Sequence, residues 1–516
     1  MTRPTPVTTV DAEADDVIDH LGGRRVDVDD SLLRRLSGAC AEVSREAGDR
    51  AEAGRDWWPL AIGWATAGEV PARPSVVARP TDTAQVAAVL NLCNQANVPV
   101  TAAGGRSGVC GASVPVFGGV ALDLCGLAGL GEVDGNSLVA DLWAGTFGPD
   151  VESGLRDGHR LTLGHWPQSM DLSTVGGWLA CRGAGQYSNR YGKIEDMVLG
   201  LEVVLADGSV VRTGGHGPRA ATGPDLTQLF VGSEGTLGVI TQGRFRVHTV
   251  PEGEERRAFG FPTFADGLDA CRRILRRGAS PAVLRLYDAT ESGRSFDLGE
   301  TNVLIVLDEA DPALVGATLA VVDDECAAAD RLQVELVERW LGHRNDVSAL
   351  EPLWRSGIVV DTVEVSARWG ALPGLYRSVL DALAGVEGTL VASSHQSHAY
   401  TDGACLYFTF AGRPADANGI GIGSGSGRVG ADTDLAQWVE RYYRQAWDRV
   451  TEATLDAGGA ISHHHGIGIN RSRFLATALG GGMGVLASLK RALDPNGILN
   501  PGKLGLDSPF GPVPWP

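Results

Sequence analysis

The stretch TAAGGRSGVCG at residues 101–111 decides how the first half of this chain folds. It continues an apolar, strand-like run, and Gly104, Gly105 and Gly108 remove the side chains that would keep a ligand away from the backbone. Successive N–H groups in such a turn can point at one anion, which is typical of a pyrophosphate site. The glycine spacing differs from the G-x-G-x-x-G of a Rossmann turn, so the pattern predicts another kind of phosphate-binding loop. Taken alone, the stretch is also explained by a purely structural turn.

The segments on either side of this loop predict a mixed α+β domain. Upstream, SVVARP at residues 75–80 is strand-like, and TDTAQVAAVLNLCNQAN at residues 81–97 has the periodicity of an amphipathic helix that begins at a Thr/Asp pair. Downstream, short strand-like segments separated by glycine-rich turns continue to residue 248. We therefore expect residues 73–250 to form one loop-rich α+β domain.

The remaining sequence divides into three parts with different patterns. Residues 1–72 combine a polar leader, a helix expected over residues 30–47 and a tryptophan-rich loop. Residues 251–450 alternate longer helices with strands, which predicts a cap domain built from an antiparallel sheet with helices packed on one face. A Gly/Ser tract at residues 419–427 lacks the Lys-Ser/Thr of a phosphate loop and predicts a surface insertion. Residues 451–516 form a C-terminal segment with a histidine-rich turn.

Composition argues against several classes of function. A chain of 516 residues is long enough for two or three domains. Its net charge of -19 repels phosphate backbones, so nucleic acid is not an expected partner. The eight cysteines form no C-x-x-C pair, which argues against a zinc ribbon or a disulfide framework and favours reduced thiols. Neither a signal-peptide core nor an apolar stretch of membrane-spanning length is present, so we expect a cytoplasmic protein.

The sequence leaves two questions of association open. The tryptophan-rich segment at residues 57–64 is compatible with packing in the core and with transient contact at a membrane surface, and we expect the core. The sequence is compatible with a monomer and with a homodimer.

Two further stretches repeat the glycine-rich design of the first. PQSMDLSTVGGWLACRGAG at residues 167–185 places small and hydroxyl-bearing side chains around an apolar core, as expected where a flat aromatic ring system lies against backbone. GSEGTLGVIT at residues 232–241 is another glycine-spaced turn that leads into a strand. The three stretches together favour one extended ligand site over three unrelated turns.

Five motifs occur in order along the chain: AAGGRS, PQSMDLSTVGGW, YGKIEDMVLGLEVVLADG, GSEGTLGVIT and DPNGILNPGK. Together they resemble the flavin domain of the vanillyl-alcohol-oxidase superfamily, also called PCMH-type flavoproteins. The resemblance extends from Pro74 to Gly505. It implies an α+β fold in which a two-subdomain FAD-binding domain precedes the cap and the C-terminal segment returns to the flavin site. The cofactor-binding residues that it implies are Ala103, Gly104, Gly105, Arg106, Ser107, Gly108, Pro167, Gln168, Ser169, Met170, Asp171, Ser173, Gly176, Gly177, Ala180, Arg182, Glu234, Gly235, Thr236, Gly238, Val239, Ile240, Asn500 and Lys503.

The residue beside the first glycine loop bears on how FAD is held. Many members of the superfamily tether the flavin through a histidine at this place. Arg106 stands there in this chain, so the resemblance implies non-covalent FAD. Cys110 is close enough in sequence to leave a covalent link open.

The stretch GGAISHHHGIGINR at residues 458–471 contains three adjacent histidines among only 11 in the chain. In an extended segment His463 and His465 share one face while His464 points to the other, so joint ligation of one metal ion is not expected. Imidazoles that titrate near neutrality instead favour general acid–base work or hydrogen bonding to a substrate phosphate. The alternative is a polar turn without a role in catalysis.

This turn resembles the S-H-H-H-G-[VI]-G pattern of the alkyldihydroxyacetonephosphate synthase family, and so do PAVLRLYD, DTVEVSARW and YTDGACLYFTF elsewhere in the chain. The resemblance implies a reaction without net redox change, in which the acyl chain of acyl-dihydroxyacetone phosphate is exchanged for a fatty alcohol to give an ether lipid. It implies these site residues: Tyr407 as the catalytic tyrosine, His463, His464 and His465 in the active site, Arg285 at a position important for activity, and Arg355 as a weaker candidate for binding the substrate phosphate.

The main alternative is a FAD-linked dehydrogenase of D-2-hydroxy acids such as lactate or glycolate, so the expected partner is a small phosphorylated lipid or a hydroxy acid. That branch holds a divalent metal through two histidines and a glutamate, in a G-H-x-G-D-G-N-x-H segment and an E-H-G turn. Tyr407 and His464 stand at two of these positions, so we expect no metal site. The chain departs from the synthase pattern at Thr409, at Ile469 and in an insertion at residues 413–432. These departures bear on the identity of the substrate more than on flavin binding. A flavin-binding protein without catalysis is a third hypothesis.

Overall fold

The structure is a computed structural model that describes residues 10–348, 350–414 and 433–515. Its first sheet has four strands, in the order β2 (Glu42–Ser44), β4 (Val76–Arg79), β6 (Val120–Asp123) and β5 (Val100–Ala103). β4, β6 and β5 run parallel, and α4 (Thr83–Ala96) crosses between β4 and β5. The Asp82 carboxylate begins this helix by accepting the N–H of Gln85 at 2.8 Å. The β-α-β unit expected before the glycine loop is therefore confirmed.

The second sheet is antiparallel and has a hydrophobic core of its own. Its five strands follow the order β11 (Val210–Gly214), β10 (Val198–Val204), β12 (Val239–Arg246), β8 (Val139–Trp143) and β7 (Leu130–Asp134). Side chains from α5 (Gly148–His159) and α6 (Val175–Cys181) complete this core, and the partly buried leucines of α18 (Gly482–Leu493) pack against it. The C-terminal segment thus returns to the first half of the chain.

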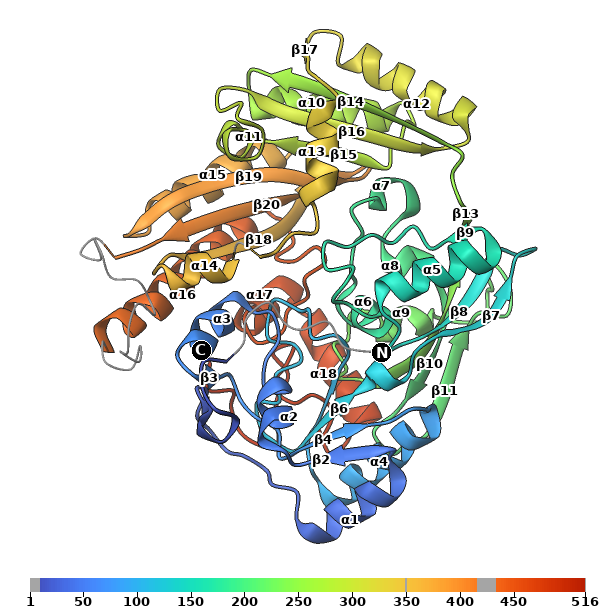
Figure 1. Cartoon of the computed structure of the whole chain (residues 1–516), viewed down its shortest axis with the longest axis vertical. Coiled ribbons are helices and arrows are strands. Elements are labelled where there is room, and N and C mark those ends of the chain that lie inside the picture. The colour runs from blue at the N-terminus through green and yellow to red at the C-terminus, as the bar shows by residue number, and fades with distance from the viewer. Residues whose placement is uncertain (1–9, 349, 415–432, 516) are drawn as a thin grey trace.

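The third sheet has seven antiparallel strands and forms the upper part of the molecule in Figure 1. Its order is β17 (Asp330–Arg331), β14 (Gly253–Phe261), β16 (Asn302–Ala310), β15 (Val283–Tyr287), β19 (Thr389–Ala399), β20 (Gly403–Gly412) and β18 (Val359–Arg368). The α+β fold with an antiparallel cap sheet is confirmed.

Helices cover both faces of the cap sheet, so the expectation of helices on one face is wrong. Along β16, Leu304 and Val306 pack into the cluster that contains α10 (Phe264–Arg276) and α12 (Pro312–Glu325). Val303 and Ile305 point the other way, into the cluster of α13 (Glu335–His343). Both faces of the strand are apolar, as this double cover requires.

The N-terminal helix is shorter than the pattern predicts. α1 (Asp30–Ala39) ends at Ala39, and the next residue, Cys40, has an extended backbone with φ of -128°. The next residues form β2, which pairs with β4, and then the separate helix α2 (Ala47–Glu52). Pairing with the sheet outweighs the helical pattern there.

The tryptophan-rich segment packs in the core, as expected. Trp58 is fully buried and Trp64 is 6% exposed, and both meet the Trp515 ring edge-on at 5.2 and 6.0 Å. Within the described part of the chain, no helix combines the length and the apolar character needed to cross a bilayer. The Gly/Ser tract at residues 419–427 lies outside the described residues.

Candidate functional site

A cavity of about 440 Å³ lies where the four-stranded and five-stranded sheets meet the seven-stranded cap sheet. One wall consists of the glycine-bearing loops after β5, before and within α6, and before β12. The opposite wall comes from β18, β19 and β20 and from the histidine turn. This volume lies within the usual range for a ligand pocket.

The backbone of the first glycine loop closes against the second loop. A Cβ at Gly104 would lie 2.1 Å from Thr174 Oγ1, and one at Gly105 would lie 1.9 Å from the Leu172 carbonyl oxygen. Only glycine permits this approach. The wall is therefore lined by peptide groups, and the hydroxyls of Thr174 and Ser113 are buried there without a hydrogen-bond partner among the described residues. Such a wall fits a dinucleotide with phosphate oxygens and a flat ring system.

Most residues expected to bind FAD line this cavity, although which of them touch the cofactor stays a prediction. The expected residues in the lining are Ala103, Gly104, Gly105, Arg106, Ser107, Gly108, Pro167, Gln168, Ser169, Ser173, Gly176, Gly177, Ala180, Glu234, Gly235, Gly238, Val239 and Ile240. Arg285, Tyr407, His464 and His465 line the same cavity.

Asn500 and Lys503 lie behind the cavity wall. Asn500 Nδ2 donates to the carbonyl oxygens of Ala112 at 2.9 Å and Glu234 at 2.6 Å, and Lys503 Nζ donates to that of Val114 at 2.8 Å. Burial lowers the pKa of Lys503 to about 8. In this structure both side chains hold the loops that form the wall.

The other expected cofactor residues also lie outside the lining. Asp171 and Arg182 are exposed, and Arg182 pairs with Glu195 at 3.4 Å. Met170 is buried, and the hydroxyl of Thr236 donates to the Ser233 carbonyl oxygen at 2.7 Å.

Arg355 is not brought to the cavity. It ends α14 (Leu350–Arg355), where its guanidinium pairs with Asp11 at 2.6 Å and with Glu351 at 2.7 Å. Two carboxylates already compensate its charge, and it is absent from the described lining.

A buried carboxylate shapes the histidine turn. Glu364, in β18, accepts the backbone N–H groups of His463 at 2.9 Å, His464 at 3.3 Å and His465 at 2.6 Å. The fully buried Arg471 guanidinium lies 3.1 Å away. Burial opposes ionisation of Glu364, but Arg471, His465 and the backbone N–H groups outweigh it and lower the pKa to about 2.

A second buried carboxylate holds the far end of the same turn. Glu234, from the loop before β12, accepts the backbone N–H groups of Ile467 at 2.5 Å and Gly468 at 2.9 Å. The turn is therefore bonded both to the cap sheet and to the glycine-loop half of the molecule.

Tyr407 is the point on which the histidines converge. Its hydroxyl oxygen lies 2.6 Å from His464 Nε2 and 3.0 Å from His465 Nε2, and His464 Nδ1 lies 2.8 Å from His463 Nδ1. The expectation that His464 points away from His465 is wrong. The turn is not extended, because its backbone N–H groups all point at the Glu364 carboxylate. In this conformation the rings of His464 and His465 both point toward the Tyr407 hydroxyl.

The phenol and the histidine rings of the turn are uncharged at neutral pH. Burial lowers the pKa of His463 and His464 well below the usual value and that of His465 to about 4. Burial also raises the pKa of Tyr407 well above its usual value. At neutral pH the imidazoles are therefore proton acceptors and the phenol keeps its proton.

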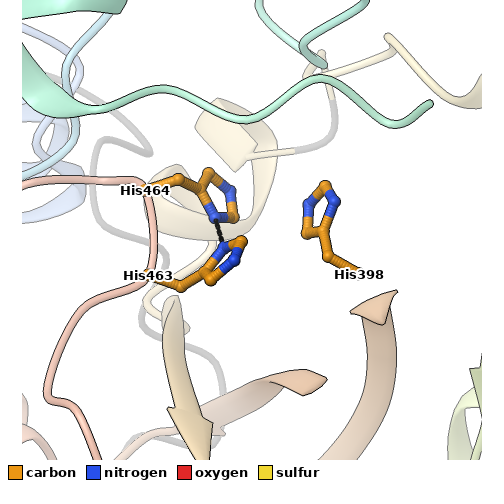
Figure 2. A group of neighbouring side chains, drawn as sticks. All are labelled: His398, His463 and His464. Atoms are coloured by element: carbon orange, nitrogen blue, oxygen red, sulfur yellow. Dashed lines mark hydrogen bonds between the residues drawn. The ribbon is translucent and has the colours of Figure 1, made fainter. Parts of the chain in front are cut away.

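Sequence reasoning missed two histidines of β19. His398 lines the cavity, and its Nδ1 lies 2.8 Å from Ser188 Oγ. Figure 2 shows its ring facing those of His463 and His464, and ligand nitrogens of the three lie within 4.8 Å of one another. Three imidazoles so placed suit a transition-metal ion. His395 packs beside Tyr407 on the same side of the sheet, with ring centres 5.0 Å apart.

Comparison with known proteins identifies the family of this chain. Residues 74–214 match a family model described as FAD binding domain, and residues 250–504 match one described as FAD linked oxidases, C-terminal domain. The chain is 31% identical over 449 residues to an uncharacterized FAD-linked oxidoreductase, YgcU, of Escherichia coli (strain K12), with 84% of this chain and 89% of the relative covered.

Two further relatives differ in their named activities. Alkyldihydroxyacetonephosphate synthase of Dictyostelium discoideum is 29% identical over 477 residues, covering 85% of this chain and 74% of the relative. Glycolate oxidase subunit GlcD of Bacillus subtilis (strain 168) is 28% identical over 444 residues, covering 84% and 89%.

Solved structures show the same fold. An alkyldihydroxyacetonephosphate synthase matches with a TM-score of 0.76 at 25% identity, covering 96% of this chain and 89% of that chain. p-Cresol methylhydroxylase matches with a TM-score of 0.73 at 17% identity, covering 94% and 99%. The family models, the relatives and the shared fold lead to one conclusion: this chain belongs to the PCMH-type FAD flavoproteins, and its cofactor is FAD.

Proposed function

We propose that this FAD enzyme exchanges the acyl chain of an acyl-dihydroxyacetone phosphate for a fatty alcohol, without net redox change. The observation that carries the proposal is the Tyr407 phenol held between two imidazoles in the cavity. Similarity to alkyldihydroxyacetonephosphate synthases over most of the chain supports it. FAD, when bound, supplies a ring system able to react with the substrate carbon, and the residues of the chain place the protons.

The hydrogen bonds around Tyr407 define where those protons lie. A phenol has one proton, so it donates to one imidazole and accepts from the other. His465 Nδ1 lies 3.7 Å from Glu364 Oε1, and because a carboxylate only accepts, this favours a proton on Nδ1. His465 Nε2 then accepts from Tyr407, while His464 Nε2 donates to the phenol oxygen. His464 Nδ1 in turn accepts from His463 Nδ1.

These positions give each residue a separate role. His465 accepts the phenolic proton at Nε2 while the Tyr407 oxygen accepts a proton from the substrate carbon beside the carbonyl. His464 stabilises negative charge on the phenol oxygen through its Nε2–H, and His463 holds that tautomer in place. The acyl group leaves as a fatty acid, which takes the hydroxyl proton of the incoming alcohol. The same path then returns the carbon-bound proton to the substrate, so the enzyme ends the cycle with the protons with which it began.

We also propose that FAD is bound without a covalent link. Cys110 is 1% exposed, does not line the cavity, and accepts the N–H of Ile469 at 2.8 Å through its carbonyl oxygen. Acid precipitation should therefore release all of the flavin into the supernatant, and flavin that stays with the pelleted protein would contradict this.

The proposed role of Tyr407 is tested with acyl-dihydroxyacetone phosphate and 1-hexadecanol as substrates. Tyr407→Phe keeps the ring and removes one hydroxyl, so we expect the exchange rate to fall at least about 100-fold. His465→Gln should cause a comparable loss. His216→Ala, in an exposed loop, is the control and should leave the rate unchanged. Flavin absorbance verifies cofactor content, and retained exchange by a flavin-loaded Tyr407→Phe enzyme would rule out the mechanism.

A second candidate function is FAD-linked oxidation of a D-2-hydroxy acid. The His398, His463 and His464 cluster favours it, because those nitrogens are spaced for a metal ion, and so does the similarity to glycolate oxidase subunit GlcD. Anaerobic mixing with D-lactate or glycolate separates the two candidates. Bleaching of the flavin that stops after treatment with a chelator supports the oxidation, whereas exchange that survives the chelator supports the synthase reaction.

A further inference from the structure

Arg285 is a cation in the cavity wall without a compensating carboxylate. Among the described residues, two arginines line the cavity, Arg106 and Arg285. Arg106 lies 3.7 Å from the buried carboxylate of Asp123. Arg285 makes no ion pair with a carboxylate of the described residues, and its described side-chain hydrogen bonds go to uncharged rings. A positive charge presented to a cavity in this way recruits a negative group from the ligand.

Neighbouring rings hold the guanidinium from behind. Its Nε donates to the Tyr287 hydroxyl oxygen at 2.7 Å, and its Nη2 donates to His395 Nε2 at 2.6 Å. Its central carbon lies 5.4 Å from the Tyr287 ring centre and 5.9 Å from that of Trp340. With Nε and one N–H of Nη2 engaged, the N–H groups of Nη1 and the second N–H of Nη2 are left to bind a ligand.

His395 has to be neutral for this contact to exist. An arginine side chain only donates, so Nε2 of His395 is the accepting nitrogen and the ring proton lies on Nδ1. That Nδ1 is 3.5 Å from Glu291 Oε2. Burial, together with the charge of Arg285, lowers the pKa of His395 to about 4. The ring is therefore an uncharged acceptor at neutral pH, and the whole charge of the pair stays on Arg285.

The register of the cap sheet places His395 between Tyr287, which holds Arg285, and Tyr407. Tyr287 on β15 pairs with His395 on β19, which pairs with Tyr407 on β20. The His395 ring stacks on both tyrosines, at 5.3 Å with 27° between planes and at 5.0 Å with 10°. One buried imidazole thus fixes both the position of Arg285 and the plane of the Tyr407 ring.

We propose that Arg285, held by His395, is the anchor for an oxyanion of the substrate, a phosphate monoester or a carboxylate. The inference rests on the proposed active site around Tyr407 and adds the chemistry of the charged end of the substrate. Both oxyanions accept N–H donors in the plane of a guanidinium. His395 is a positioning residue in this scheme, and Arg355, already paired with two carboxylates, is not the anchor.

Direct binding measurements test the anchor. The FAD-loaded protein is titrated with dihydroxyacetone phosphate and, separately, with oxalate, and the change in flavin absorbance gives each dissociation constant. Binding of the phosphate identifies a phosphorylated substrate, and binding of oxalate identifies a carboxylate. Arg285→Met should weaken whichever anion binds at least about 10-fold. Arg355→Met is the matched control and should leave that affinity unchanged. The opposite pattern, or no binding of either anion to the wild-type protein, overturns the proposal.

Two variants of His395 separate positioning from general disruption. His395→Phe keeps a ring between the tyrosines but removes the acceptor, so it should weaken the bound anion as Arg285→Met does. His395→Gln restores an acceptor and should recover part of the affinity. Flavin content should be unchanged in both. Equal loss in both variants would show that the ring is needed only for packing and would overturn the positioning role.

The pH dependence of binding gives an independent readout. Because Arg285 stays charged and His395 is neutral, oxalate affinity should be constant between about pH 6 and pH 8. Affinity that falls as pH rises through about 6.5 would make a protonated histidine the anchor and contradict the proposal. Loss of exchange activity with intact anion binding would refute only the function proposed above, whereas exchange with no effect of Arg285→Met on binding would refute only this anchor.

Discussion

At the scale of single residues, Glu364 does more for the site than its distance from any substrate suggests. Glu364→Gln removes the negative charge opposite the fully buried Arg471. Breaking one side of a buried pair costs about 3–5 kcal/mol, so we expect the free energy of unfolding to fall by about that amount. Urea denaturation measures it. Glu452→Gln, which breaks the exposed pair with Arg449, should change stability by less than about 1 kcal/mol.

An equal effect of the two substitutions would show that Glu364 is not a buried ionic anchor. The outcome also bears on catalysis, because the N–H groups that Glu364 accepts belong to the histidines themselves. A destabilised variant with intact exchange would separate stability from positioning of the turn.

Motifs revealed Tyr407 and the three histidines, but they did not reveal their partners. Strand alternation puts His395 and His398 on opposite faces, since they are three positions apart. The register shifts between Gln396 and His398, and this bulge brings both rings to the cavity side. No local pattern announces such a bulge, so neither residue was predicted. Arg355 is the opposite case: the resemblance suggested it for the substrate phosphate, but the structure places it beside Asp11 and outside the cavity lining, so its role stays a prediction.

At the scale of elements, the contact between the first two glycine loops is the feature most sensitive to substitution. A Cβ in Gly105→Ala would lie 1.9 Å from the Leu172 carbonyl oxygen, so the loops must separate. We expect FAD affinity, measured by fluorescence titration of the apoprotein, to fall at least about 10-fold because peptide donors leave their positions.

Gly158→Ala is the matched control for this experiment. Gly158 lies in α5, and an added Cβ meets nothing within 4 Å. Alanine is the better helix former by up to about 1 kcal/mol, so this variant should bind FAD normally and be slightly more stable. Normal FAD affinity in Gly105→Ala would mean that the loop contact does not shape the cofactor site.

Elements with strong periodicity were predicted well, and the exceptions have a physical cause. The helix α4 and the strands β4, β5, β6, β8, β10, β11 and β12 follow from residue spacing and turn chemistry. The end of α1 does not, because the chain leaves the helix to pair β2 with β4, a contact between distant residues. The two-sided cover of β16 was missed for a similar reason, since only packing shows which helix takes each face.

At the scale of the whole molecule, His20 links the N-terminal segment to the helix α16 (Thr433–Asp456). Its ring nitrogens lie 2.6 Å from Glu69 and 2.7 Å from Glu440, and the ring stacks on Trp64 at 4.0 Å. Burial disfavours the charged ring, but the two carboxylates outweigh it and raise the pKa of His20 to about 9.

This link predicts a specific loss of stability at alkaline pH. The folded-state pKa is higher than the unfolded value of 6.5, so the contribution is complete below about pH 6.5 and disappears as pH rises through about 9. Thermal unfolding of the wild type and of His20→Gln should therefore differ most near pH 6 and converge near pH 10. A difference in melting temperature that does not change with pH would disprove the ionic link.

The overall architecture was accessible from sequence because five ordered motifs span both halves of the chain, and the family comparisons confirm it. The return of the C-terminal segment to the flavin site was also implied by the resemblance. The contacts that hold it there were not accessible, because they join residues hundreds of positions apart, such as the Glu234 carboxylate and the Gly468 N–H.

The doubly anchored histidine turn has a mechanical consequence. Glu364 fastens it to the upper sheet, and Glu234 fastens it to the lower body, within six consecutive peptide units. A hinge motion that separates the cap sheet from the glycine-loop half would break several charge-assisted hydrogen bonds at once. The structure therefore resists hinge opening at this turn. The relative positions of the histidine rings, the cap sheet and the glycine loops are therefore set when the chain folds.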